Sequence, residues 1–215
     1  MQAALPASIN PIVISYPPDQ CINYENLLPL ILARLPVDEP FILFGESFSG
    51  PLAVMISANR PANLVGVILC ATFVTPPRPF VGWAIRLLAR PSIFSVFPTA
   101  QRLKAIIGGN ATPEILALFS QVHAVLKPEV AAFRVRTVFR VDARDQLRLC
   151  DAPMLYIAAE NDKVVPDRNI KIIRKIKPNL QVVTIDAPHA IPLARPVQVA
   201  AAIDSFAALL QSNGA

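Results

Sequence analysis

Short apolar runs alternate with helical patterns along most of the chain, and this alternation restricts the fold more than any other feature. The runs are rich in β-branched and aromatic residues and are the predicted strands: 12–16, 41–44, 64–73, 154–158 and 180–185. Apolar residues recur at helical spacing in the segments beside them: 27–35, 52–56, 167–177 and 196–210. Strands that alternate with helices form a parallel sheet with crossover helices. The sequence therefore predicts the α/β class, with a mostly parallel sheet flanked by helices.

The middle of the chain breaks this alternation. The patterns there predict helices and no strand, over 79–90, over 99–107, and onward from Thr112 and from Pro128. We therefore expect a discontinuous α/β core, residues 1–75 and 141–215, interrupted by a helical cap insertion over residues 76–140.

Composition and charge exclude several kinds of protein. Of the 215 residues, 53% are hydrophobic and 16% are charged, which predicts one domain with a large core and excludes a disordered chain. The net charge of +5 is mild, and the basic residues form no run that would bind nucleic acid. No apolar run fits a membrane span, and the N-terminus lacks a signal-peptide pattern. Cys21, Cys70 and Cys150 have no metal or redox spacing, so we expect buried thiols in a cytoplasmic protein.

Residues 45–50, with the sequence GESFSG, lie between a predicted strand and a predicted helix. A serine hydroxyl becomes a nucleophile when it is presented on a tight strand-to-helix turn of the form G-x-S-x-G, next to a base. The flanking residues must be small because the turn brings backbones close together. Gly45 fits this form, and Ser49 departs from it but is still small. The motif predicts Ser47 as a nucleophile.

Two later residues fit the chain order Ser, then Asp or Glu, then His, in which such sites are built. Asp162 follows the predicted strand 154–158, although turns often contain an aspartate for structural reasons alone. His189 follows the predicted strand 180–185, where the base is expected. The other histidine, His123, precedes the acid and lies in a helical pattern, so we interpret it as a helix-face residue.

Three segments together resemble bacterial α/β-hydrolase fold proteins of the serine esterase type: 45–53 their nucleophile turn, 160–166 their acid loop and 187–189 their histidine loop. The resemblance implies Ser47 as nucleophile, His189 as general base and then acid, and Asp162 as the group that orients the imidazole. It also implies that the backbone N–H of Phe48 is an oxyanion donor. An acyl-enzyme mechanism of this kind requires no metal or cofactor.

The N-terminal part departs from that family pattern. Family members have further strands there, one of which ends in a glycine-containing loop that provides a second oxyanion N–H. No glycine precedes Gly45 in this sequence. We therefore expect an N-terminally truncated sheet, in which segment 12–16 either pairs directly with 41–44 or leaves a gap beside it.

Together these features predict a serine hydrolase that cleaves a carboxylic ester, or a thioester or amide, through an acyl-enzyme on Ser47. An acyltransferase would use the same residues, and the alternative is a non-catalytic or truncated member of the fold that acts as a binding module or has no activity. The expected partner is a small-molecule ester or acyl substrate.

The apolar, arginine-containing segment 80–97 has three interpretations: packing on the core, a substrate lid, or contact with a membrane surface. The oligomeric state is not predicted.

Overall fold

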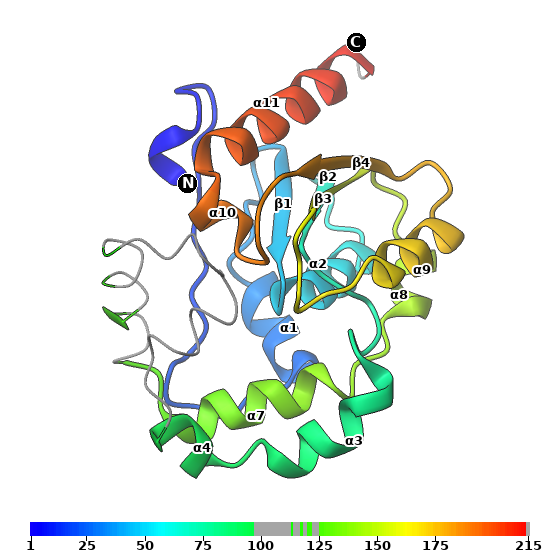
Figure 1. Ribbon diagram of the computed structural model, residues 1–215. Coiled ribbons are helices and arrows are strands. Elements are labelled where there is room, and N and C mark those ends of the chain that lie inside the picture. Colours follow the sequence, from blue (N-terminus) through cyan, green and yellow to red (C-terminus); the bar gives the residue numbers. More distant parts are fainter. Residues whose placement is uncertain (97–112, 114–116, 118–119, 122–124, 214–215) are drawn as a thin grey trace.

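The computed structural model describes residues 1–96, 113, 117, 120–121 and 125–213. Its centre is a four-stranded sheet in which neighbouring strands follow the order of the chain and all pair in parallel (Figure 1). The strands are β1 (Phe41–Glu46), β2 (Leu64–Cys70), β3 (Met154–Ala159) and β4 (Gln181–Ile185). The predicted parallel sheet flanked by helices is confirmed.

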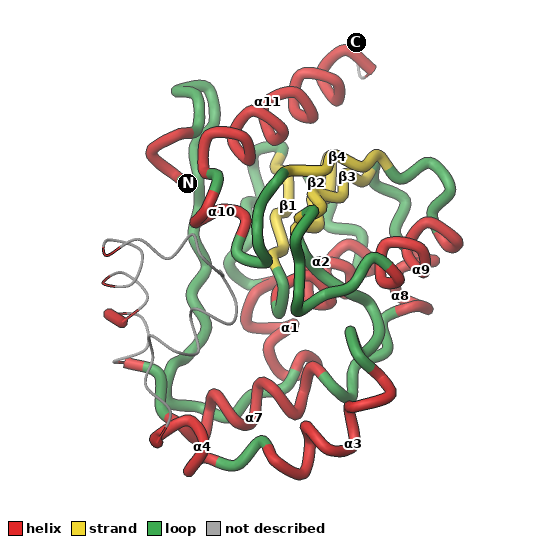
Figure 2. Tube along the Cα trace, in the orientation of Figure 1, coloured by secondary structure: helices red, strands yellow, loops and turns green. Residues whose placement is uncertain are grey.

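Helices cover both faces of the sheet (Figures 1 and 2). Alternate strand residues face opposite sides, so Val67 and Leu69 of β2 join one apolar cluster while Ile68 and Cys70 join the other. The first cluster is packed by α1 (Tyr24–Leu32), α2 (Ser49–Ala58), α8 (Arg144–Leu149) and α9 (Arg168–Ile176). The second is packed mainly by α11 (Pro196–Asn213), with α10 (Ile191–Ala194) and the short helix η1 (Gln2–Ala4) beside it.

The strand predicted at residues 12–16 is wrong. This segment is extended but pairs with no strand, and Ile12 and Val13 are 61% and 66% exposed. β-branched residues favour an extended backbone, but a strand also requires a hydrogen-bonded neighbour. Here Ile14 and Tyr16 pack on the core instead, and the direct pairing with β1 does not form. In the described part of the chain, β1 is therefore an edge strand.

The described residues between 76 and 140 contain helices and no strand. These helices are α3 (Pro79–Leu88), α4 (Pro91–Val96) and α7 (Pro128–Val138), and α7 contacts both of the others. The helix predicted at 99–107 lies outside the described residues, as do His123 and most of the helix predicted after Thr112. The division into a core and a cap stays a prediction.

Two further expectations can be compared with the structure. Cys70 and Cys150 are buried free thiols, as expected, but Cys21 is exposed because it lies on the loop before α1. Among the described helices, none combines the length and the apolar character needed to cross a bilayer.

The connections that follow the four strands all leave the sheet at the carboxyl ends of the strands. In open α/β sheets this edge is where ligands and reactive side chains gather. The turn at Ser47 follows β1, and the segment at Thr72 follows β2. The loops of Asp162 and His189 follow β3 and β4. The topology thus brings four segments that are distant in the sequence to one place.

Candidate active site

Ser47 occupies the tight turn between β1 and α2. Its φ angle of 47° lies in the left-handed region, which is costly for a residue with a side chain. The Ser47 N–H donates to the carbonyl of Cys70 at 2.9 Å, and so continues the pairing of β1 with β2. The surrounding structure therefore holds Ser47 in the strained conformation that the motif predicts.

Close backbone packing explains the small residues around Ser47. A Cβ atom on Gly45 would lie 2.8 Å from the Cβ of Ala53, and one on Gly50 would lie 2.0 Å from Oγ1 of Thr72. Neither position has room for a side chain. Ser49, which departs from the strict motif, has a partner of its own, because its hydroxyl accepts a hydrogen bond from Tyr16 at 2.8 Å.

The structure brings together the three predicted residues Ser47, His189 and Asp162. Ser47 Oγ lies 2.8 Å from His189 Nε2, and His189 Nδ1 lies 2.8 Å from Asp162 Oδ2. With the proton on Nδ1, the imidazole donates to the carboxylate and accepts from the serine hydroxyl. An arrangement of this kind can supply a nucleophile, a base and an orienting acid.

The predicted acid and the predicted base are shielded from water, and the acid is held in place. The side chains of Asp162 and His189 are only 5% and 7% exposed. Asp162 Oδ1 accepts hydrogen bonds from the N–H groups of Val164 and Val165, both at 2.8 Å. Because Oδ1 is occupied in this way, Oδ2 is the oxygen that faces His189.

Phe48, the predicted oxyanion donor, lies just before the first residue of α2. The first N–H groups of a helix have no intrahelical acceptor and are available to a ligand. The Phe48 ring stacks on Tyr24 with the ring centres 4.8 Å apart, and Tyr24 donates a hydrogen bond to the Phe48 carbonyl at 2.9 Å. The guanidinium of Arg134 in α7 lies 5.8 Å from the centre of the Phe48 ring.

The sequence patterns did not reveal several residues that hold this turn. Tyr16, Tyr24, Thr72 and Arg134 contact it directly, and Tyr156 hydrogen-bonds to Thr72 behind it. Each comes from a different segment of the chain and belongs to no local motif. Their roles depend on long-range packing, so no signal in a single sequence identifies them.

Glu46 and Cys70 place two more ionisable groups close to the turn. Burial raises the pKa of the partly buried Glu46 carboxyl to about 7, while the nearby charge of His189 acts in the opposite direction. Burial also raises the pKa of the Cys70 thiol, and the carboxylates of Glu46 and Asp162 add to this effect. Cys70 therefore stays protonated, and it is not a competing nucleophile.

Glu46→Gln is expected to remove a pH dependence of folding stability. A glutamate in the unfolded chain ionises near pH 4.5, whereas Glu46 in the folded protein ionises near pH 7, so the folded state holds the proton more tightly between these values. The wild type should therefore lose about 3 kcal/mol of stability as the pH rises through this window. The neutral glutamine should show no such loss. Urea unfolding of both proteins at about pH 5 and pH 8 measures the difference, and parallel stability curves would contradict it.

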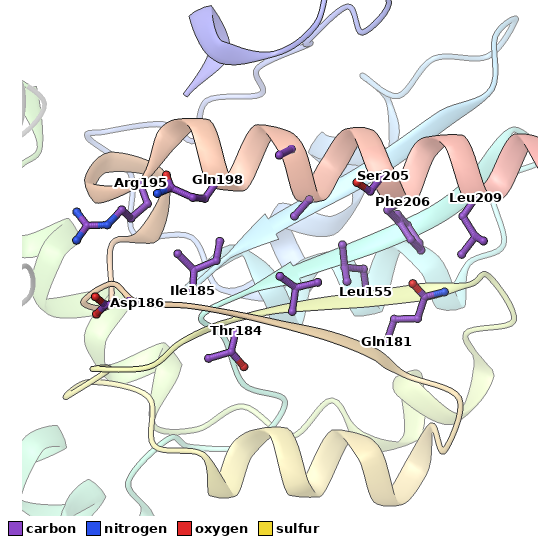
Figure 3. Close-up of a pocket in the computed structure, with 13 residues that line it drawn as sticks. Leu155, Gln181, Thr184, Ile185, Asp186, Arg195, Gln198, Ser205, Phe206 and Leu209 are labelled. Atoms are coloured by element: carbon purple, nitrogen blue, oxygen red, sulfur yellow. The ribbon is translucent and has the colours of Figure 1, made fainter.

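A cavity of about 730 Å³ lies elsewhere, between α11 and the strands β3 and β4 (Figure 3). Its lining includes Leu155, Ile185, Phe206 and Leu209, with Asp186 and Arg195 near one end. None of the predicted site residues lines it. Within the described residues, no cluster of three or more His, Cys, Asp or Glu side chains is arranged to hold a metal ion.

Comparisons with known proteins give a family and a set of similar folds. A sequence model of the alpha/beta hydrolase family matches residues 11–202. No curated protein matches the chain. A thermophilic esterase from Thermogutta terrifontis is 25% identical with a TM-score of 0.68, and the match covers 87% of this chain and 71% of the esterase.

Two other solved structures are similar at lower identity. MenH from S. aureus is 19% identical with a TM-score of 0.75, and the match covers 92% of this chain and 80% of that one. The enol-lactonase from Burkholderia xenovorans LB400 is 17% identical with a TM-score of 0.73, and the match covers 87% of this chain and 74% of the lactonase. At these identities the likeness shows the fold.

Proposed function

Because the chain belongs to the alpha/beta hydrolase family, we propose that it is a serine hydrolase that cleaves a small-molecule carboxylic ester, or a thioester or amide. The observation that carries this proposal is the continuous chain of contacts from Ser47 Oγ through His189 to Asp162, with both distances at 2.8 Å. The Thermogutta esterase, at 25% identity, supports an ester as the substrate class.

The proposed reaction has two halves. His189 Nε2 takes the hydroxyl proton as Ser47 Oγ attacks the carbonyl carbon of the substrate, and it then gives this proton to the leaving group as the tetrahedral intermediate collapses. The acyl group is now bonded to Ser47. In the second half, His189 takes a proton from water, which attacks the acyl carbon, and His189 returns that proton to Ser47 Oγ as the acid leaves. Throughout, Asp162 keeps the imidazole oriented and stabilises its positive charge.

Negative charge develops on the carbonyl oxygen in both tetrahedral intermediates. In this proposal the N–H of Phe48 donates to that oxygen, helped by its place at the N-terminus of α2. An acyltransferase would pass through the same acyl-enzyme and differ in the second acceptor. Adding an alcohol to the assay distinguishes the two, because a transferase forms the new ester in preference to the free acid.

The predicted cap over residues 76–140 is proposed as a wall of the substrate site. Three contacts of Arg134 in α7 with the region around Ser47 support this. Arg134 lies over the rings of both Tyr16 and Phe48, at 5.7 and 5.8 Å, and it donates to the carbonyl of Pro17 at 3.0 Å. The middle region therefore packs directly against the residue that follows the nucleophile.

The alternative is a member of the fold without catalysis, and one observation favours it. No glycine precedes Gly45, so the glycine-containing loop that supplies the family's second oxyanion donor does not come from this part of the chain. Losing one such donor typically lowers the rate by about two to three powers of ten.

Hydrolysis of p-nitrophenyl acetate, butyrate and octanoate by the purified protein separates the two functions. The proposed enzyme gives saturable release of p-nitrophenol above the rate in buffer. Folded protein that turns over none of these esters, or of the matching thioesters, would favour the non-catalytic alternative.

A further inference from the structure

The peptide group between Ser47 and Phe48 is held on its carbonyl side. The hydroxyl of Thr72 donates to the Ser47 carbonyl at 2.5 Å. A trans peptide is planar, so its C=O and N–H bonds point in opposite directions. A hydrogen bond that fixes the direction of the Ser47 carbonyl therefore also fixes the direction of the Phe48 N–H.

Thr72 is itself held by one buried tyrosine. The Thr72 side chain is fully buried, and its N–H donates to the Tyr156 hydroxyl at 2.9 Å. The Tyr156 hydroxyl donates in turn to the Thr72 carbonyl at 2.7 Å. Tyr156 lies on β3 and is 1% exposed, and burial raises the pKa of its phenol far above the usual value. The phenol therefore stays protonated at neutral pH and keeps both hydrogen bonds.

The neighbouring glycine is what allows this contact. Thr72 Oγ1, Cγ2 and Cβ would all lie within 2.6 Å of a Cβ atom on Gly50. Any side chain at position 50 would thus displace Thr72 from the Ser47 carbonyl. On the far side of Phe48, the hydroxyl of Tyr24 holds the next carbonyl. Both peptide groups that flank Phe48 are therefore fixed from outside the turn.

We infer that Thr72, anchored by Tyr156, is a positioning residue that aims the Phe48 N–H at the oxyanion. It acts through the Ser47–Phe48 peptide and does not touch the substrate. The inference rests on the proposed serine hydrolase function. It means that two buried residues, Thr72 after β2 and Tyr156 on β3, affect the rate of the reaction without touching the substrate.

Thr72→Val tests the inference because valine keeps the shape of threonine and removes the hydroxyl. We expect kcat to fall on the order of tenfold with KM unchanged. This fall is smaller than the one caused by removing a whole oxyanion donor, because the Phe48 N–H is still present. Thr72→Ser keeps the hydroxyl and should restore most of kcat. A boronic acid inhibitor, which forms a tetrahedral adduct with the serine, should bind the valine variant more weakly by the same factor. A purely structural role would not link these two losses.

Ser57→Ala is the control. Ser57 also has a buried hydroxyl, but it lies near the far end of α2, about two helical turns beyond the Ser47 turn. Removing this hydroxyl should leave kcat and the boronic acid affinity unchanged. Tyr156→Phe provides a second route to the same result, and it should lower kcat without changing KM. Combined with Thr72→Val, it should cause no further loss.

The outcomes separate this inference from the proposed function. If the wild type hydrolyses esters and folded Thr72→Val matches it in kcat and in boronic acid affinity, the inference is overturned and the hydrolase stands. If Thr72→Val does not fold, a Tyr156→Phe variant with normal kcat overturns it instead. Wild-type protein that neither hydrolyses esters nor binds the boronic acid would overturn both.

Discussion

Replacing Ser47 with alanine is expected to lower kcat for ester hydrolysis about a million-fold. The substitution removes the atom that bonds to the acyl group, and what remains can only assist direct attack by water. Alanine has the same Cβ as serine, so the strained turn at φ 47° should be kept. Single-turnover kinetics with excess enzyme measures the loss, and urea unfolding checks that the stability of the variant is close to that of the wild type.

Ser49→Ala is the matched control for this prediction. Ser49 lies two residues away in the same turn, but its hydroxyl accepts from Tyr16 and makes no contact with His189. We expect its kcat to stay within about tenfold of the wild type. A Ser47→Ala variant that keeps a substantial part of wild-type kcat, or a Ser49→Ala variant that loses as much, would contradict the assignment of the nucleophile.

Asp162→Asn should lower kcat by about four powers of ten while leaving the loop intact. The N–H groups of Val164 and Val165 require an acceptor at the Oδ1 position, so the asparagine carbonyl should point there. Its NH₂ group then faces His189 Nδ1 in place of the carboxylate oxygen. Nδ1 must accept that hydrogen bond, which moves the imidazole proton to Nε2 and leaves no base for the Ser47 hydroxyl.

Asp186→Asn controls for the loss of a negative charge in this region. Asp186 accepts a hydrogen bond from Asn161 at 2.8 Å and makes no contact with the imidazole. Its kcat should stay near that of the wild type. The orienting role of Asp162 would be contradicted if the two variants lost activity equally, or if Asp162→Asn kept most of its kcat.

Local patterns were sufficient for the strands that form the sheet. The runs beginning at Phe41, Leu64, Met154 and Gln181 are short, rich in β-branched or aromatic residues and separated by helical patterns. The two central strands, β2 and β3, are largely buried, whereas most residues of β4 are exposed. Segment 12–16 has a similar composition but pairs with no strand. Composition shows that a segment prefers an extended backbone. Whether it pairs as a strand depends on which segment lies beside it, and local periodicity does not show that.

The same distinction applies to the site. Ser47, Asp162 and His189 could be predicted to lie together because each follows a strand of a parallel sheet, and the carboxyl ends of such strands meet at one edge. Thr72 and Tyr156 could not be predicted, because a threonine after one strand and a tyrosine within another have no local signature. Their contacts become visible only once β2 pairs with β3 and Gly50 packs against Thr72: Thr72 then bonds to the Ser47 carbonyl, and Tyr156 bonds to Thr72.

Reaction with a fluorophosphonate, followed by proteolysis and mass spectrometry, tests the central claim most directly. Such a probe phosphonylates a serine that is activated by a neighbouring base, and it does not require the natural substrate to be known. The proposed function predicts one adduct per chain, on the peptide that contains Ser47, and its loss in His189→Ala. Folded protein that gains no adduct, or an adduct on a different serine, would contradict the claim that Ser47 is the nucleophile of this site.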